Sequence, residues 1–295
     1  MAADANRATL VLIHRSFADA AVKSSAYGHI LPFFETMFTL QEAAVKTVGP
    51  KPILQDGQAL NAEHEGRWPL LDRRHLPVDQ TAATDMLASL CDNAEKPTEA
   101  LQQAALVMRK RLLDSGDDIA RGYRLLLKDD QDGMKKLALD IGMDAFMLNF
   151  FLYNSLLPTI VGHARLLAQH LDAGQSLETG HCPICGGMPN FSYFSDNGER
   201  LLVCHFCRHQ WQVKRNFCPV CNAIKTRGID YFFSETEKAY RVYTCADCRT
   251  YLKTVDTRKL DRPFYPPLEI LVTAHLDLQA KENGFQGIVP GPWSG

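Results

Sequence analysis

Several catalytic and membrane signatures are missing from this sequence. It contains no Gly-x-Ser-x-Gly motif, Walker loop, Rossmann glycine set or His-Glu-x-x-His motif, so we expect no catalytic residues and no enzyme activity. Its most apolar run, residues 145–161, is 17 residues long and includes Pro158. Because a membrane helix needs roughly 20 apolar residues, we expect a buried helix that is broken at Pro158, and no membrane insertion.

A secretory signal and an excess of charge of one sign are missing as well. The stretch up to Leu31 has no apolar core followed by a small-residue cleavage site, so we expect a reducing, cytoplasmic location. The 295 residues include 32 Lys and Arg and 34 Asp and Glu, which is a net charge of -2, and 46% of them are hydrophobic. These values are typical of a globular protein that is long enough for two domains.

Cysteine, in contrast, is concentrated between residues 182 and 248. Eight of the nine cysteines form Cys-x-x-Cys pairs: Cys182 with Cys185, Cys204 with Cys207, Cys218 with Cys221, and Cys245 with Cys248. This spacing lets one tight turn direct two thiolates at a single metal ion. The gaps between the pairs are 18, 10 and 23 residues, where the two longer gaps suit hairpin arms and the shorter one suits a connector. The array therefore predicts metal binding.

The four pairs also repeat. Cys-Pro-Ile-Cys at 182–185 resembles Cys-Pro-Val-Cys at 218–221, and an arginine follows both the second and the fourth pair. Such repetition indicates a duplicated module. The natural grouping is sequential: Cys182, Cys185, Cys204 and Cys207 hold one ion, and Cys218, Cys221, Cys245 and Cys248 hold a second. An interleaved grouping stays open. Four thiolates leave no open coordination position, which favours a structural or electron-transfer site that holds iron or zinc.

Other uses of these residues are less consistent with the pattern. Disulfides are disfavoured by the expected reducing compartment and by the single Cys91, which we expect to be inert core. A redox Cys-x-x-Cys normally occurs once, on a strand-to-helix turn. His181, His205 and His209 lie beside the pairs, but eight thiolates already make two sets of four, so we expect these histidines outside the ligand sets.

Residues 181–262 are locally basic, with 13 Lys and Arg against 8 Asp and Glu. A basic metal-binding module is one signature of nucleic-acid binding. The formal net charge of this segment is +5. Two divalent ions, each bound by four thiolates, would, however, add a charge of about -4 and leave the segment with a net charge of about +1. The basic residues largely balance the metal centres, so we expect no nucleic-acid partner.

The part of the chain before the cysteines is predicted to be helical. From His29, apolar residues recur at helical spacing and stop at Gly49-Pro50. Further helices are expected from residue 79 or 81, from Pro97-Thr98-Glu99, over 121–128, over 133–155, and from Pro158 onward. Composition changes at Gly174, so we predict that residues 1–174 form an all-helical domain.

Aromatic and β-branched residues around tight turns characterise the cysteine-rich part. Asp196-Asn197-Gly198 separates two such runs and predicts a hairpin. We predict a four-cysteine ribbon at 175–217, a second at 218–262, and at 263–295 a C-terminal helix and tail that pack on the helical domain. Ribbons of this size bury too little apolar surface to fold unaided, so metal is expected to stabilise them. The predicted fold class is α+β, mostly α.

These features resemble the FdhE family, cytoplasmic accessory proteins for the formation of active formate dehydrogenase. The resemblance lies in the helical domain, the four cysteine pairs and the terminal helix. Its matching segments are Trp68–Leu71 through Leu76–Asp79, Cys182–Gly186, Cys204–Trp211, Tyr251–Lys253, Leu276-Asp277 and Asn283–Phe285. The cysteine array is the specific part of the match.

The resemblance implies two rubredoxin-like sites for iron or zinc, with the eight paired cysteines as ligands. It also implies binding to the catalytic subunit of a formate dehydrogenase during maturation, and a homodimer is left open. Rubredoxin-type turns favour glycine after the second cysteine of each pair. Gly186 fits and Asn222 tolerates that turn, whereas the left-handed backbone is expected to cost more free energy at Arg208 and Arg249. The alternative function is a rubredoxin-like Fe(Cys)4 electron-transfer protein.

Overall fold

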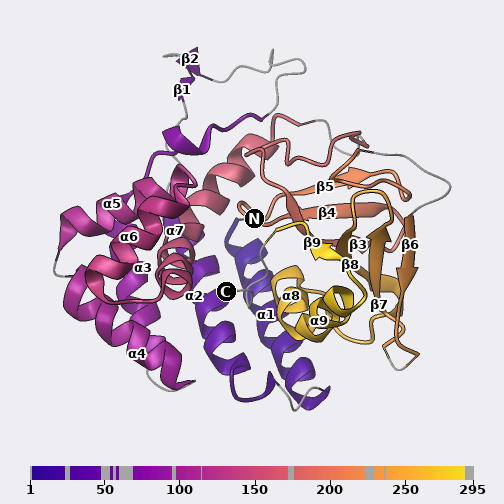
Figure 1. Ribbon diagram of the computed structural model, residues 1–295, viewed down its shortest axis with the longest axis horizontal. Helices are drawn as coiled ribbons and strands as arrows, with labels where there is room; N and C mark the ends of the chain where they lie inside the picture. The colour runs from indigo at the N-terminus through magenta and orange to yellow at the C-terminus, as the bar shows by residue number, and fades with distance from the viewer. Residues whose placement is uncertain are drawn as a thin grey trace. The chain divides into compact units, whose positions relative to one another are not determined.

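The computed structural model describes residues 2–23, 27–47, 54–55, 58–59, 69–94, 98–113, 115–171, 176–222, 229–235 and 237–289. The chain forms two compact units, one of Met1–His64 with Leu71–Leu166 and the other of Glu65–Leu70 with Leu167–Gly295. Helices dominate the first unit and a β-sheet dominates the second (Figure 1). The predicted class, a mostly helical α+β fold with helices first and cysteine-rich modules after them, is confirmed.

The first unit is built from helices. They are α1 (Ala2–Lys23), α2 (Leu31–Thr47), α3 (Gln80–Asn93), α4 (Glu99–Val107), α5 (Gly116–Leu127), α6 (Gln131–Ile141) and α7 (Ala145–Ala168). A 3-10 turn spans Arg73–His75, and a π-helical turn, Met108–Leu113, continues α4. Two short strands, β1 (Leu54–Gln55) and β2 (Gln58–Ala59), also lie within the range that the sequence predicted to be entirely helical.

Short polar side chains begin several of these helices where the sequence indicated. Asp79 accepts a hydrogen bond from the backbone N–H of Ala82 (3.0 Å), and Thr98 accepts one from Leu101 (3.2 Å). Each bond satisfies an N–H that has no partner within the first helical turn. The predicted starts of α3 and α4 are therefore confirmed.

The helix predicted over 133–155 is wrong in its boundaries. Helix α6 ends at Gly142, whose φ of 73° is left-handed, and the backbone N–H of Met143 donates to the Ala138 carbonyl (2.8 Å). A left-handed glycine with this reverse hydrogen bond ends a helix. The chain therefore stops one helix at Gly142 and starts α7 at Ala145.

The predicted break at Pro158 is also wrong, because α7 runs through this residue. A proline inside a helix lacks the N–H that would donate to the carbonyl four residues earlier, here that of Asn154. Gln41 of α2 donates from Nε2 to this carbonyl (3.0 Å) and also to Asn154 Oδ1 (3.1 Å). The helix continues because a side chain from α2 satisfies the acceptor that proline leaves open.

This continuation changes the argument about membrane insertion. Helix α7 has 24 residues and, within the described residues, is the one helix long and apolar enough to cross a membrane. The length argument from the sequence therefore does not hold. However, 67% of the most apolar 18-residue stretch of this helix is buried inside the protein. Leu157 and Val161, for example, pack with Val45 of α2, as in a core helix.

The second unit contains a seven-stranded sheet. Its strands are β3 (Pro189–Phe194), β4 (Arg200–Cys204), β5 (Gln210–Val213), β6 (Ile229–Phe232), β7 (Tyr240–Cys245), β8 (Thr250–Asp256) and β9 (Gln286–Gly287). The order is β5-β4-β3-β8-β7-β6, and β9 pairs with β8. The hairpin predicted at 196–198 is confirmed, since β3 and β4 pair antiparallel and Gly198 has a φ of 76°. Strands β5 and β8 were not anticipated.

The two cysteine-rich modules are joined within this sheet. Strands β3–β5 belong to the first module and β6–β8 to the second, and β3 pairs with β8 in parallel. At this join the buried hydroxyls of Ser192 and Thr254 are hydrogen-bonded at 2.6 Å. The modules therefore share one sheet rather than forming separate ribbons.

The C-terminal segment forms two helices, α8 (Pro266–Val272) and α9 (Ala274–Glu282), where the sequence predicted one. The described contacts join these helices to the sheet, and the packing of residues 263–295 on the helical domain stays a prediction. Leu276 and Ala280 pack on Val242 and Tyr251. Apolar side chains of β7 and β8 thus cover the inner face of α9.

Buried ion pairs fasten these helices to the sheet. Lys253 Nζ of β8 lies 2.7 Å from Asp277 Oδ2 of α9. Arg262 Nη2 lies 2.7 Å from Glu269 Oε2 of α8, and the Tyr240 hydroxyl of β7 donates to the same oxygen (2.9 Å). Lys253 and Arg262, both buried, therefore each have a carboxylate beside them, which offsets the cost of burying their charge.

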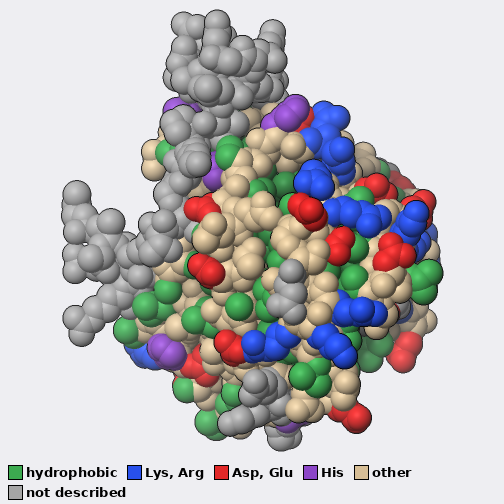
Figure 2. All heavy atoms as spheres, turned by 90° about the vertical axis from the view of Figure 1, so that its left-hand side faces the viewer, with side chains coloured by type: hydrophobic (Ala, Val, Ile, Leu, Met, Phe, Trp, Pro, Cys, Tyr) green, Lys and Arg blue, Asp and Glu red, His purple; other side chains and the backbone are tan. Residues whose placement is uncertain are grey.

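Charges of both signs share the face of the molecule drawn in Figure 2. On that face Lys and Arg side chains lie among Asp and Glu side chains, with apolar groups between them. Among the side chains visible there, charge of neither sign forms a continuous surface. A basic stripe of the kind that tracks a phosphate backbone is therefore not a feature of this view.

Candidate metal centres

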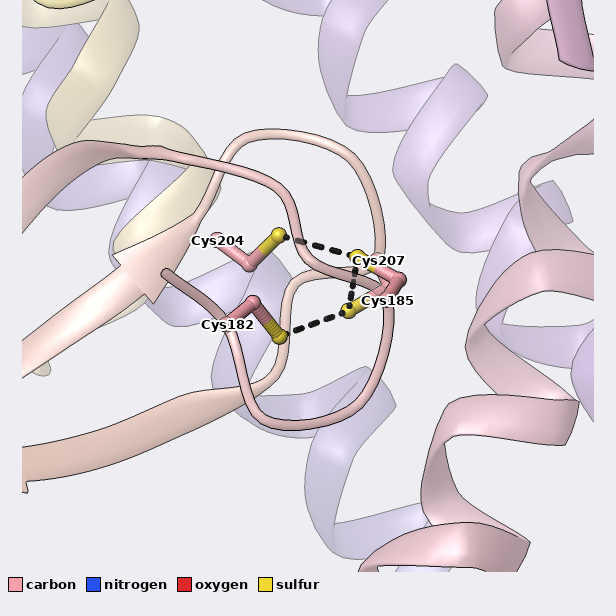
Figure 3. A group of neighbouring side chains, drawn as sticks. All are labelled: Cys182, Cys185, Cys204 and Cys207. Carbon is pink, nitrogen blue, oxygen red and sulfur yellow. Dashed lines mark hydrogen bonds between the residues drawn. The ribbon is translucent and has the colours of Figure 1, made fainter. Parts of the chain in front are cut away.

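The first group of four cysteines, called the first quartet (Cys182, Cys185, Cys204 and Cys207), lies at one end of the β3–β4 hairpin. One pair precedes β3 and the other begins at Cys204, the last residue of β4, so the antiparallel pairing of these strands brings both turns together. All four residues are buried, and their sulfurs face one another (Figure 3). The sulfur of Cys185 lies 3.5 Å from that of Cys204 and 3.4 Å from that of Cys207.

The second quartet (Cys218, Cys221, Cys245 and Cys248) repeats this arrangement at the β6–β7 hairpin. Sulfur-to-sulfur distances are 3.6 Å between Cys218 and Cys248 and 3.8 Å between Cys221 and Cys245. Within each quartet all sulfurs lie within 4.8 Å of one another. The structure thus groups the pairs sequentially, which is the first of the two groupings that the sequence allowed.

These distances fit metal ligands better than disulfides. A disulfide bond is about 2.05 Å long. Four sulfurs at about 2.3 Å from a tetrahedral ion are about 3.8 Å apart. Both quartets could therefore hold a zinc or iron ion with little movement, although the geometry does not select between the two metals.

Exposure differs between the two quartets. Every cysteine of the first quartet is buried. In the second quartet Cys221 is exposed and Cys248 is partly exposed. The Cys248 sulfur also lies 3.0 Å from the Thr250 hydroxyl. Solvent and chelators can therefore reach the second site more easily than the first.

The backbone after each pair has the left-handed turn of a rubredoxin-like site. Values of φ are 70° at Gly186, 58° at Arg208, 53° at Asn222 and 55° at Arg249. Both arginines therefore adopt the left-handed turn despite its expected cost. In the second quartet, backbone N–H groups of Val220 and Cys221 reach the Cys218 sulfur. Such donors stabilise a thiolate.

Interactions of Arg249 offset the cost of its left-handed backbone. Its guanidinium donates to the Gly284 carbonyl (3.1 Å) and lies 4.4 Å from the centroid of the Phe285 ring. Its own carbonyl accepts a hydrogen bond from Gln286 (2.9 Å). The segment after α9 therefore holds the turn that glycine would otherwise favour.

Burial disfavours the charged thiolate at several cysteines of the quartets. Burial raises the pKa of the Cys182 and Cys207 thiols well above the usual value, and it raises the pKa of Cys218 to about 12. A bound cation reverses this effect, because it stabilises the thiolate directly. The donor set of eight cysteine sulfurs thus fits soft divalent ions.

The neighbouring histidines lie outside the two quartets. His205 Nδ1 contacts the Met188 carbonyl (2.8 Å), and the His209 ring stacks on Trp211. Burial lowers the pKa of His209 to about 4, so its ring is neutral near physiological pH. Trp211 itself is buried and donates from Nε1 to the Thr179 carbonyl (3.1 Å). Its ring is therefore a packing group beside His209.

Arg200 was missed by the sequence analysis. It is the first residue of β4, and only 1% of it is exposed. Burial lowers its pKa to about 10, which still leaves the guanidinium charged at neutral pH. A lone arginine after a hairpin turn resembles any solvated strand residue, so no pattern in the sequence could have singled it out.

Comparison with known proteins agrees with the cysteine array. A family model described as the FdhE central domain matches residues 181–215, which contain the whole first quartet. "Protein FdhE homolog" of Aquifex aeolicus (strain VF5) is 33% identical over 152 residues, or 50% of this chain and 52% of that protein. The homolog of Cronobacter sakazakii (strain ATCC BAA-894) is 35% identical over 108 residues, or 35% and 34%. The chain therefore spans about half, or less, of the curated relatives it matches.

A solved structure extends the likeness to the fold. The crystal structure of the FdhE protein from Pseudomonas aeruginosa has a TM-score of 0.64 with this chain, covering 96% of this chain and 94% of that one. Its sequence identity is 20%, so this match shows the fold alone. The chain is thus similar to the FdhE family in its cysteine-rich part and in its architecture, as the sequence indicated.

Proposed function

We propose that this chain is an accessory protein needed for the formation of active formate dehydrogenase. In this role it binds the catalytic subunit during maturation, in the cytoplasm, and catalyses no reaction of its own. The two quartets hold iron or zinc, with the eight paired cysteines as ligands. The metal shapes the sheet unit into a rigid binding surface.

The observation that carries this proposal is the convergence of all eight paired cysteines into two groups of four in one compact unit. Tetrathiolate sites with no open position stabilise small modules rather than activating water. The similarity of residues 181–215 to the FdhE central domain supplies the biological context. Together they favour a metal-stabilised assembly factor over an enzyme.

Deletion of the gene in its own host tests the function. Extracts of the deletion strain are expected to lose formate-dependent dye reduction while the catalytic subunit is still made, as an immunoblot would show. Complementation with the wild-type chain should restore activity. Cys185→Ser and Cys221→Ser, one in each quartet, should restore less, whereas Cys91→Ala, which changes a buried cysteine outside the quartets, should restore it fully.

Binding to the catalytic subunit requires a separate measurement. A tagged wild-type chain is expected to co-purify with the catalytic subunit from cells in which maturation is under way. Normal formate dehydrogenase activity in the deletion strain would contradict the proposed function. Full activity with both cysteine variants would contradict the proposed role of the metals.

One observation favours a second candidate, a rubredoxin-like Fe(Cys)4 electron-transfer protein. The residue after each second cysteine has a φ between 53° and 70°, even at Arg208 and Arg249. That turn directs backbone N–H groups toward sulfur, which tunes iron–sulfur potentials. Protein purified without oxygen should then contain iron and absorb visible light through thiolate-to-iron charge transfer. A preparation that contains zinc alone would exclude this candidate.

A further inference from the structure

Arg200 is a buried cation at the start of β4, on the hairpin that carries the first quartet. Its Nη1 donates to the backbone carbonyls of Arg215 and Phe217, both at 2.9 Å. Its guanidinium carbon lies 4.8 Å from the centroid of the Tyr243 ring. These contacts turn the side chain away from its own quartet and toward the second hairpin, because Phe217 directly precedes Cys218.

The other buried cations of this unit show what Arg200 lacks. Lys253 has Asp277 beside it at 2.7 Å, and Arg262 has Glu269 at the same distance. Arg200 has no carboxylate partner among the described residues, and its buried Nε has no hydrogen-bond partner there either. An unpaired buried charge is unfavourable unless another anion compensates it.

The anion that the structure offers is the second metal site. Arg200 lines a cavity of about 20 Å³ together with Cys218, Cys245, Tyr243 and Thr250. Four thiolates around a divalent ion carry a net charge of about -2. The guanidinium and two cysteines of the second quartet thus border the same small, half-open hollow. Because Arg200 itself is buried, its charge is screened less there than in water.

Backbone packing fixes the two modules at this point. The backbone N–H of Gly180, two residues before Cys182, donates to Asn222 Oδ1 (3.1 Å). A Cβ atom at Gly180 would collide with the carbonyl of Pro219, so the chain of the first module lies directly on the second cysteine turn. Arg200 is therefore held in place relative to Cys218 by the shared sheet and by this close contact.

We propose that Arg200 supplies the counter-charge of the second tetracysteine site, so that the first module completes the metal site of the second. This inference rests on the metal occupancy proposed above. It makes the two sites unequal in a way that their cysteine spacing does not show. Arg200 acts as a positioning residue through its charge and is not itself a ligand.

The test compares charge with hydrogen-bonding capacity at position 200 in the full chain loaded with zinc under reducing conditions. Arg200→Gln removes the charge and keeps a side-chain donor, whereas Arg200→Lys keeps the charge and loses the planar fork. Zinc is withdrawn with a chromophoric chelator. The freed cysteines are then alkylated and identified by mass spectrometry, which shows which quartet has released its metal.

We expect Arg200→Gln to weaken zinc binding at the second quartet by about tenfold or more and to leave the first quartet within about twofold, because the lost charge faces the second site. Arg200→Lys should stay within about threefold of wild type at both quartets. Arg215→Met is the matched control, since its guanidinium donates twice to the Gly198 carbonyl on the same hairpin but is exposed. It should change neither site.

Several results would overturn the inference. Arg200 would have a purely structural role if Arg200→Gln weakened zinc binding equally at both quartets or did not weaken it at all. The same would follow if Arg200→Lys lost as much zinc affinity as Arg200→Gln. If Arg200→Gln does not fold, Arg200→Met is a second neutral variant, and failure of both to fold with zinc would also refute a loss confined to one site. A wild-type chain that binds fewer than two zinc ions would instead refute the proposed metal function.

Discussion

The hydrogen bonds around Pro158 allow a quantitative prediction for the stability of the helical unit. Gln41 is 2% exposed and donates both to the Asn154 carbonyl and to Asn154 Oδ1. Gln41→Leu removes both donors and leaves two buried acceptors unsatisfied. At about 1–3 kcal/mol for each acceptor, less the gain from a more apolar side chain, the free energy of unfolding should fall by about 2–4 kcal/mol.

The same reasoning predicts how this loss depends on proline. Pro158→Ala restores a backbone N–H that can donate to the Asn154 carbonyl within α7. In that background Gln41→Leu leaves one unsatisfied acceptor instead of two. The destabilisation by Gln41→Leu should therefore be smaller by about 1–2 kcal/mol, which a double-mutant cycle measures directly.

Denaturant unfolding followed by far-ultraviolet circular dichroism is a suitable assay, because the helical unit supplies most of the signal. Gln103→Leu is the control, since it makes the same chemical change on the exposed face of α4. It should alter the free energy of unfolding by less than about 0.5 kcal/mol. Additive effects of Gln41→Leu and Pro158→Ala, within about 0.5 kcal/mol, would refute the account of why α7 continues.

The remaining predictions concern the sheet unit. On stepwise zinc removal, Cys221 should be alkylated before any cysteine of the first quartet, because its side chain is exposed. Gly180→Ala should speed zinc release from the second quartet, because the new methyl group collides with the Pro219 carbonyl. The Arg258 guanidinium, hydrogen-bonded to Asp256 (2.7 Å), holds the pKa of Asp256 below 3.8. The resulting stabilisation should be complete above about pH 5 and lost as pH falls through the lowered pKa. Asp256→Asn should abolish this acid-dependent loss in unfolding midpoints.

Controls distinguish these effects from general damage. Gly116→Ala adds the same methyl group where no atom lies within 4 Å, so zinc release should not change. If any cysteine of the first quartet were alkylated before Cys221, Cys221 would not be more accessible than the first quartet, contrary to the structure. If the Asp256→Asn variant still lost the same stability in acid, carboxylates other than Asp256 would account for the acid-dependent loss.

Local signals in the sequence accounted for much of the fold. Asp79 and Thr98 marked helix starts, because short polar side chains satisfy the first N–H groups of a helix wherever they occur. The turn at Asp196–Gly198 marked a hairpin for a similar local reason. The break expected at Pro158 does not occur and the costly turn expected at Arg249 does, for the same reason. In each case a side chain or segment far away in sequence offsets a local backbone cost.

The sequence by itself determined the sulfur ligands of the two candidate metal sites, because Cys-x-x-Cys spacing places two sulfurs on one turn whatever surrounds them. It also determined the order of helices and cysteine-rich modules. Only the tertiary structure decided that the pairs group sequentially, that the second quartet is the more exposed one, and that Arg200 faces it. The grouping depends on the antiparallel hairpins β3–β4 and β6–β7. The place of Arg200 depends on the parallel pairing of β3 with β8, which joins residues some 60 positions apart and leaves no periodic trace in the sequence.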